Sequence, residues 1–254
     1  RHGLRPLKAW RYVGVFCDEL MLCVATVRIG PVRQCFWAIW ERRERRLHEA
    51  TRLGRGAVRL TPGRVCIDDG AIAVDLALAE TAGIETIAPS GAAYGWTRKQ
   101  GGITAAGTVA ISGRRHTVSA RAIVDDTCAY YKRHTAWRWS AGVGADSDGR
   151  AVAWNLVAGI NDPPVASERT VWIDGVAQEV GPVLFAADLG AVTPVDRGHG
   201  GLLFTAEAAR ERDENRLIVR SRYRQPFGTF AGELAAGVRL AHGLGVMEEH
   251  DVHW

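Results

Sequence analysis

Glu168 is one of four side chains whose type and position in the sequence suit acid–base chemistry. It follows a turn at residues 162–164 (sequence DPP), and we expect this loop to lie at the entrance of an enclosed pocket. A carboxyl group placed over an apolar cavity has a raised pKa and can act as an acid. The alternative is a surface ion pair between Glu168 and Arg169, which would add little to stability.

His134, Tyr94 and His250 are three further candidates for proton donors. His134 is the only histidine in residues 130–162, and its ordinary pKa suits an imidazole to proton transfer near neutral pH. A solvated outer strand face that holds a structural histidine is the favoured alternative for His134. His250 lies three residues from His253, so the two side chains face opposite sides of a strand, and we predict no metal site there.

Arg220, Arg222 and Arg224 alternate along one face of a predicted strand, with Tyr223 on the opposite face. Three like charges in a row are destabilising unless solvent or an anion surrounds them. Solvation is the more common outcome. The alternative is a pocket rim at which Arg222 holds an anionic head group through paired hydrogen bonds and Tyr223 contacts the ligand.

The segment 151–159 reads as a strand in which one face has almost no bulk. Such a face either touches another backbone closely or leaves room for a ligand, and we predict that it lines a ligand cavity; it carries Ala151, Ala153, Asn155, Val157 and Gly159. Asn155 is its only strong hydrogen-bonding side chain. A buried amide without partners costs about 1–3 kcal/mol, so either a ligand or a neighbouring protein group must satisfy Asn155.

Aromatic residues accompany this small-residue face. Trp137 and Trp139 share one face of the preceding strand, whereas Arg138 lies on the other, and Trp154 belongs to the small-residue strand itself. We assign these four side chains, together with Asn155, as candidate ligand contacts.

Nucleotide binding and serine hydrolysis find no support in the sequence. The glycines of residues 142–144 and 200–201 lack the strand–GxGxxG–helix context and are interpreted as turn glycines. Ser167 and Ser221 occur in no nucleophile-elbow sequence. We therefore expect no cofactor, and any chemistry has to come from side chains.

Composition narrows the class of protein. The 254 residues are 47% hydrophobic, and no apolar run is long enough for a membrane-spanning helix. Five scattered cysteines without a CxxC pair indicate reduced thiols in a cytoplasmic protein. Although the pI is about 9.0, the net charge is only +4, and the one dense basic run, residues 41–46, contains two glutamates. We predict no nucleic-acid partner. The chain begins with Arg1 close to a predicted strand, so an N-terminal segment or a signal peptide can precede it.

Short strands must position these side chains, because strand signals follow one another along the whole chain. Segments rich in Val, Ile and aromatic residues are separated by turns such as Asp174-Gly175. Only residues 41–53 and 207–216 consist of helix formers, and neither carries a wide apolar stripe. This pattern predicts an all-β sandwich or barrel with at most one or two short helices.

Several motifs occur in an order that resembles a known family. They are WRYVGVF from residue 10, YGWTRKQGG from 94, HTAWRWSAGVG from 134, DGRAVAWNLVAGIND from 148, FGTFAG from 227 and GVMEEHDVHW from 245. Their order and spacing resemble the uncharacterised bacterial domain-of-unknown-function family 2804. That family is similar to the lipocalin-like superfamily of hydroxyneurosporene-synthase-like carotenoid hydratases and tocopherol cyclases.

The resemblance implies two lipocalin-like antiparallel β-barrel halves packed together, in agreement with the independent strand pattern. We place their junction in the polar patch of residues 125–127, which gives an N-terminal half at 1–127 and a C-terminal half at 128–254. The resemblance supplies no established reaction, because fold alone does not define function.

We expect the protein to bind a small, largely hydrophobic, lipid- or isoprenoid-like molecule in a barrel lumen. One version adds cofactor-free hydration, isomerisation or cyclisation, with a proton from Glu168, His134, Tyr94 or His250 and with Asn155 orienting the substrate. The other version is a non-catalytic carrier or sequestering protein. A purely structural β domain would instead fill the lumen with side chains.

Overall fold

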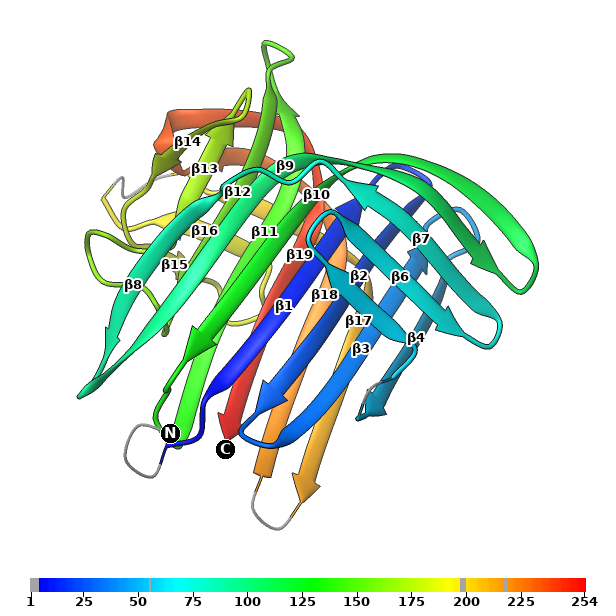
Figure 1. The fold of residues 1–254 in the computed structure, drawn as a ribbon. Helices are drawn as coiled ribbons and strands as arrows, with labels where there is room; N and C mark the ends of the chain where they lie inside the picture. Colours follow the sequence, from blue (N-terminus) through cyan, green and yellow to red (C-terminus); the bar gives the residue numbers. More distant parts are fainter. Residues whose placement is uncertain (1–4, 55, 197–199, 217–218) are drawn as a thin grey trace.

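Antiparallel strands make up almost the entire chain (Figure 1). The computed structural model describes residues 5–54, 56–196, 200–216 and 219–254; the side chains of residues 216 and 219 are not described. The all-β fold predicted from the sequence is confirmed, as two curled antiparallel sheets that form half-barrels.

The first sheet contains ten strands and takes up the N-terminal half of the chain. Its hydrogen-bonded order is β4-β3-β2-β1-β10-β9-β7-β6-β5, with β8 paired to β9. The strands are β1 (Lys8–Phe16), β2 (Leu20–Ile29), β3 (Val32–Glu41), β4 (Arg46–Leu53), β5 (Val58–Thr61), β6 (Arg64–Asp69), β7 (Ile72–Leu78), β8 (Ile84–Ser90), β9 (Ala93–Ile111) and β10 (Arg114–Ala129).

The second sheet contains nine strands, in the order β14-β13-β12-β11-β19-β18-β17-β16-β15. The strands are β11 (His134–Asp146), β12 (Ala151–Ala158), β13 (Thr170–Ile173), β14 (Val176–Glu179), β15 (Val183–Phe185), β16 (Ala191–Pro194), β17 (Leu202–Arg216), β18 (Val219–Leu234) and β19 (Val238–His253). The chain passes from the first sheet to the second at residues 130–133, whereas the patch at 125–127 lies within β10.

Both sheets follow one plan. In each, the first strand pairs with the last, so that β1 is bonded to β10 and β11 to β19. The hydrogen-bonded path breaks after the fourth strand, between β4 and β5 in the first sheet and between β14 and β15 in the second. Such a meander curls on itself and brings its inner face around a core.

The two segments with helix-forming composition are not helical. Residues 46–53 form β4 and residues 207–216 belong to β17, and the one helical turn of the described chain is the 3₁₀ turn Ala235–Gly237. Intrinsic propensity is a weak preference, and pairing with β3 and β18 overrides it here. No helix among the described residues is long and apolar enough to cross a membrane.

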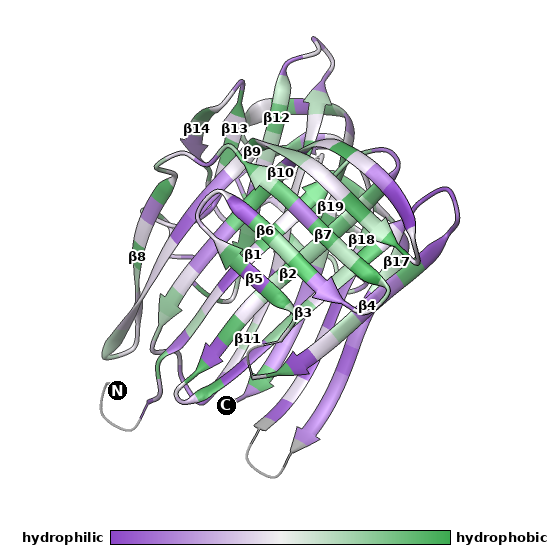
Figure 2. Cartoon of the chain, turned by 45° about the vertical axis from the view of Figure 1, so that its right-hand side comes forward, coloured by the Kyte–Doolittle hydropathy of each residue, from purple (hydrophilic) through white to green (hydrophobic). Residues whose placement is uncertain are grey.

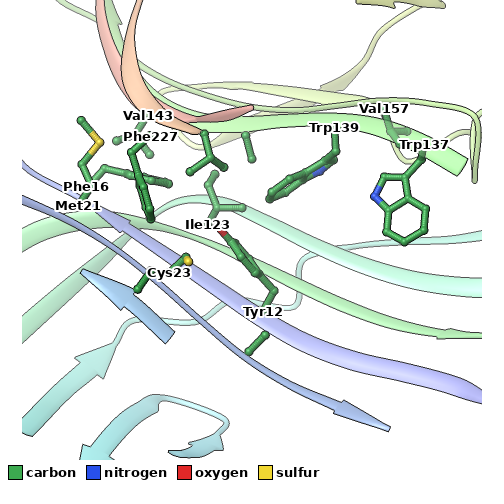
Figure 3. Packing of buried hydrophobic residues seen from close by; sticks show 14 of the residues in the cluster. Tyr12, Phe16, Met21, Cys23, Ile123, Trp137, Trp139, Val143, Val157 and Phe227 are labelled. Carbon is green, nitrogen blue, oxygen red and sulfur yellow. The ribbon is translucent and has the colours of Figure 1, made fainter. Parts of the chain in front are cut away.

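Three hydrophobic clusters hold the structure together. One lies within the first sheet and includes Val13, and a second lies within the second sheet and includes Val152. The third combines both sheets; Figure 3 shows Tyr12 of β1 and Trp139 of β11 meeting within it. Central strands therefore bury both faces and read as continuous apolar runs, while hydrophilic residues collect at the projecting ends of β17 and β18 (Figure 2).

Small residues let the two sheets approach closely. A Cβ atom added at Gly101 of β9 would lie 2.3 Å from the Trp172 ring of β13. A Cβ atom at Gly102 would lie 3.3 Å from the Cβ atom of Ala153. The small-residue face of β12 thus packs against β9 at Ala153, and its Gly159 lies against the backbone of Ala136 in β11.

We predict that Gly101→Ala lowers the free energy of unfolding by about 1–3 kcal/mol, because the new methyl group would overlap the buried Trp172 ring. Urea unfolding measures the effect. Gly181→Ala is the matched control, since a Cβ atom there has no neighbour within 4 Å among the described residues, and its effect should stay within about 0.5 kcal/mol. Equal stabilities of the two variants would contradict this account of the interface.

Candidate ligand cavity

A cavity of about 160 Å³ lies between the two sheets. A dry protein cavity of about 150 Å³ holds benzene, so this space suits a molecule of about one ring. Its lining includes Trp10, Tyr12, Phe36, Lys99, Asp125, Trp137, Trp139, Glu168, Arg210, Tyr223, Glu248 and His250. A second hollow of about 250 Å³, between β8 and β14, has mostly exposed walls and lacks this concentration of aromatic and titratable groups.

One row of side chains crosses the first sheet and forms one wall. Residues directly opposite each other on paired strands point to the same face of a sheet. The register therefore places in one line, from β4 to β9, the residues Thr51, Phe36, Ala25, Tyr12, Asp125 and Lys99. All six line the cavity.

Two shorter rows of the second sheet form the opposite wall. The first row, from β17 to β11, is Arg212, Tyr223, His250 and Trp137. The second row, from β19 to β12, is Glu248, Trp139 and Val157. Trp139 meets Tyr12 of the other wall edge to face, with ring centroids 5.2 Å apart. Aromatic faces from both sheets thus enclose the space (Figure 3).

The exposed part of the cavity lining marks its entrance, near the C terminus and the β2–β3 hairpin, which lie at one end of the molecule (Figure 1). There the lining residues keep exposed surface: Arg212 is exposed, and Ile29, Gln34 and Trp254 are half-buried. A ligand larger than one ring can therefore extend toward solvent on this side.

Glu168 lies in a buried cluster of charges that joins the two halves. The Lys99 Nζ atom is 2.6 Å from Asp125 Oδ1 and 3.3 Å from Glu168 Oε1. The Asn161 amide donates a hydrogen bond to Glu168 Oε2 at 3.0 Å and lies 2.6 Å from the Tyr131 hydroxyl. Only 2% of Glu168 is exposed. Both carboxylate oxygens therefore have protein partners.

One ammonium group faces two carboxyl groups in this cluster, and this imbalance governs the proton affinity of Glu168. Burial raises the pKa of Glu168, Lys99 lowers it, and Asp125 raises it again, to about 7. Burial alone would lower the pKa of Lys99, but Asp125 and Glu168 keep it above its ordinary value. Lys99 thus stays charged while Glu168 exchanges a proton near neutral pH.

Glu248 is a second buried acid, on the opposite wall. Trp137 Nε1 donates a hydrogen bond to its Oε1 at 2.7 Å, and Gln225 Nε2 donates one to its Oε2 at 2.9 Å. Burial raises the pKa of Glu248 to about 7, although these hydrogen bonds lower it. The Tyr223 hydroxyl also adjoins Glu248 and lowers its pKa, yet it makes no hydrogen bond of normal geometry within the described chain.

His250 lines the cavity as a neutral imidazole. Its Nε2 atom shares a 2.8 Å hydrogen bond with the Ser221 hydroxyl, and its ring lies 4.4 Å from Trp137 and 5.1 Å from Tyr223. Burial lowers the pKa of His250 to about 3, although part of the residue remains accessible. The proton donation predicted for His250 stays a prediction; at this pKa the neutral ring takes part in hydrogen bonding, as with the Ser221 hydroxyl, and has little affinity for a proton.

Asn155 supports the cavity without lining it. Its Oδ1 atom accepts a hydrogen bond from Trp139 Nε1 at 2.8 Å, and its Nδ2 atom donates one to the Glu168 carbonyl at 2.9 Å. Protein groups therefore satisfy the amide. Of the small-residue face, only Val157 reaches the cavity wall, so the prediction that the whole face lines a ligand cavity is wrong.

Trp154 points away from the cavity into the core of the second sheet. It is fully buried, donates a hydrogen bond to the Ser140 hydroxyl at 3.0 Å and packs edge-on against Phe230. Gly142, its partner on β11, leaves the room for the indole, because a Cβ atom there would lie 2.4 Å from the ring. Strand alternation places Trp154 opposite to Val157, which corrects its assignment as a ligand contact.

Four other candidates lie outside the cavity lining. His134 and Tyr94 are exposed, Arg138 forms an ion pair with Glu249 at 2.8 Å, and Arg222 lies 3.8 Å from Asp213. Their side chains project from the outer surfaces of the strands, as the solvated alternatives for His134 and the arginine row anticipated. The surface-pair alternative for Glu168 and Arg169 is wrong, because both residues are buried and Arg169 donates hydrogen bonds to the carbonyl groups of Asp162, Pro163 and Val180.

The structure also brings in side chains that the sequence did not single out. Four charged residues of this kind line the cavity: Lys99, Asp125, Glu248 and Arg210. Each lies in a strand whose opposite face is also buried or paired with neighbouring side chains. Alternation could have linked Glu248 with His250, since the two are two residues apart on β19. Nothing in the local sequence identifies the pairing of Lys99 with Glu168.

His134, Asp251 and His253 form an exposed cluster near the C terminus, with potential ligand atoms within 4.8 Å of one another. His134 Nε2 is 3.0 Å from Asp251 Oδ1, and its ring stacks on that of His253. His250 faces the cavity instead, so β19 separates His250 from His253 as strand alternation predicts.

The structure defines an all-β protein of two half-barrels that share an aromatic-walled cavity. The chain belongs to the family described as domain of unknown function (DUF2804), whose model matches residues 55–254. The resemblance predicted from the sequence motifs is thereby confirmed. A comparison with curated proteins finds no match.

Solved structures share the fold along nearly the full chain. A protein from Nitrosomonas europaea assigned as AttH aligns with a TM-score of 0.60 and 13% identity, over 98% of this chain and 93% of its own. Kievitone hydratase from Nectria haematococca gives 0.60 and 10%, over 95% and 88%. CghA gives 0.50 and 11%, over 98% and 88%. At these identities the similarity concerns the fold alone.

We predict that Glu248→Gln makes stability less dependent on pH. Because burial raises the folded-state pKa of Glu248 to about 7 from 4.5, folding favours the protonated acid. That contribution is complete below about pH 4.5 and is lost as the pH rises through about 7. Relative to Glu248→Gln, the native protein should lose up to about 3 kcal/mol between pH 5 and pH 8.

Urea unfolding of both proteins at the two pH values measures this difference. A constant offset is expected as well, because Gln225 must reorient its amide beside the new glutamine. Parallel pH profiles would show that Glu248 does not retain a proton in the folded protein.

Proposed function

We propose that the protein binds a small, largely hydrophobic molecule in the cavity between its half-barrels and catalyses a cofactor-free proton-transfer reaction on it. The class of reaction is hydration, isomerisation or cyclisation of an unsaturated substrate. The observation that carries the proposal is the buried carboxyl group of Glu168, which faces an aromatic-walled cavity of about 160 Å³.

Aromatic walls supply binding and shape. Trp10 and Trp137 stack with ring centroids 6.2 Å apart, and Trp139 packs against Tyr12, so a flat or unsaturated body finds ring faces on both walls. Such faces also stabilise the positive charge that develops when an alkene or a carbonyl is protonated. The enclosed space keeps bulk water from competing for that cation.

Glu168 is the proposed acid. In a hydration, its O–H bond breaks while a C–H bond forms on the substrate, and the oxygen of a water molecule bonds to the adjacent cationic carbon. The proton released by that water passes to a base, for which the ionised form of Glu248 on the opposite wall is suited. In an isomerisation, the same base removes a proton from a neighbouring carbon. Neither route needs an oxidant or a reductant.

Similarity of fold supports this class of chemistry without identifying the substrate. Kievitone hydratase is named for a hydration, and CghA has also been solved with Sch210972. Identities of 10–13% leave the catalytic groups unassigned by comparison, so the proposal depends on the residues of this chain.

A carrier without catalysis is the second candidate. It is favoured by the complete hydrogen bonding of Glu168, whose oxygens already contact Lys99 and Asn161. In the carrier, the Glu168 carboxyl group would have a structural role alone, as a contact that joins the two halves. The same cavity would then bind the ligand and release it unchanged.

We predict that the protein purified from cells retains a hydrophobic ligand that organic extraction and mass spectrometry identify.

On incubation in D₂O, each turnover should place one solvent deuterium on a carbon atom of the product. Glu168→Gln should keep the ligand but lower the turnover by about 100-fold or more. The native rate of hydration should be highest near pH 7 and fall on either side, since it needs protonated Glu168 and ionised Glu248, and burial raises the pKa of each to about 7. Lys99, Asp125 and Tyr131 are the groups that surround the titrating Glu168.

Glu249→Gln is the control, because Glu249 pairs with Arg138 outside the cavity lining, and it should leave the turnover unchanged. Deuterium incorporation that survives in Glu168→Gln would remove Glu168 from the role of acid. A ligand that is retained but never converted would select the carrier, and a protein that binds no hydrophobic molecule would overturn both candidates.

A further inference from the structure

Arg210 is a buried guanidinium in the cavity wall that the acid–base proposal leaves unused. It lies on β17, is only 3% exposed and lines the cavity. The rings of Phe36 and Tyr223 hold it, at 4.6 Å and 5.5 Å from its central carbon. A buried arginine normally has its hydrogen-bond donors matched by acceptors.

The donors of Arg210 are incompletely matched. A guanidinium presents five N–H groups. Nη2 donates to the Thr51 hydroxyl at 2.6 Å, but Nε and Nη1 have no hydrogen-bond partner among the described residues. Glu49 lies 3.7 Å from Nη1, which is close enough to balance charge and too far for a hydrogen bond. Three N–H groups of the guanidinium, one on Nε and two on Nη1, therefore have no hydrogen-bond acceptor among the described residues.

Arg210 lies at the end of the cavity that is distant from Glu168. Thr51, its partner, begins the row that crosses the first sheet, and Lys99, the partner of Glu168, ends it five strands away. At the usual spacing of paired strands, this separation is on the order of 20 Å before the curl of the sheet shortens it. Arg212 and Glu214 follow on the same face of β17 toward the entrance, so Arg210 is the deepest of the charged β17 side chains on this side of the cavity.

We propose that the ligand carries a carboxylate or a similar oxyanion and that the Arg210 guanidinium binds it with its unmatched N–H groups. The Nε–H and Nη1–H bonds point in different directions, so each can give one charge-assisted hydrogen bond to an anionic oxygen. The hydrophobic body then extends along the aromatic walls toward Glu168. This inference rests on the proposed function and specifies its substrate class: an unsaturated, largely hydrophobic acid that is anchored at one end and protonated toward the other.

The experiment compares trans-cinnamate with its neutral amide, cinnamamide, by isothermal titration calorimetry at pH 7. The two probes share shape and unsaturation and differ in charge. The native protein should bind cinnamate about 10-fold or more tightly than cinnamamide, as expected for a desolvated charge pair. Arg210→Met should abolish this preference and leave cinnamamide binding in place.

Arg222→Met is the matched control, because Arg222 lies on the next strand with a side chain that is 72% exposed, and it should keep the preference. Glu49→Gln tests the assignment from the other direction. Removing the carboxylate nearest Nη1 should strengthen cinnamate binding about 3-fold or more without changing cinnamamide binding. This variant decides the question if Arg210→Met does not fold.

The outcomes distinguish the anion site at Arg210 from the hydrophobic pocket as a whole. If the native protein binds both probes equally, or if Arg210→Met keeps the preference for cinnamate, the anion site is wrong while the proposed hydrophobic pocket stands. If Glu49→Gln leaves cinnamate binding unchanged, the unmatched donors of Arg210 are not the site. If neither probe binds the native protein, the pocket proposed here fails, and the anion site fails with it.

Discussion

The buried ammonium of Lys99 is the constraint on which the candidate site depends. Removing a charge from water is costly, so Lys99 can lie between the sheets only because Asp125 of its own sheet and Glu168 of the loop before β13 face it. Each carboxyl group in turn needs donors, which Trp10 and Thr127 give to Asp125 and Asn161 gives to Glu168. One unpaired charge would destabilise the fold, and this demand fixes the loop before β13 against the first sheet.

The contact between Lys99 and Glu168 also explains how a carboxyl group that takes up a proton can be buried in this position. A buried salt bridge adds little net stability, yet loss of one partner leaves an uncompensated charge. With two carboxyl groups around one ammonium, the cluster can take up a proton without losing its central ion pair. Asn155 adds rigidity, because it bonds both to the carbonyl of Glu168 and to the indole of Trp139. Proton affinity, position and cavity wall thus depend on one connected set of contacts.

The sequence allowed the fold to be predicted because its information is local. Strand alternation and turn chemistry identify an all-β chain, and alternation places Trp137 and Trp139 together, as observed in the cavity wall. The site was predicted less completely. In a strand buried on both faces, hydrophobicity does not distinguish the cavity face from the core face, and Trp154 was misassigned for this reason. Lys99 and Arg210 look like ordinary strand charges until partners more than sixty residues away bury them.

Asn155 and Arg210 show how buried polar groups separate support from recognition. Both are buried, and a count of donors and acceptors distinguishes them. Asn155 has its hydrogen bonds matched by Trp139 and Glu168, so it contributes by holding its neighbours in position. Arg210 keeps two donor nitrogens unmatched within the described chain while its cationic plane is fixed by aromatic rings. A ligand oxyanion would offset the cost of the unmatched donors on binding, and this difference supports the proposed role of Arg210 in ligand recognition.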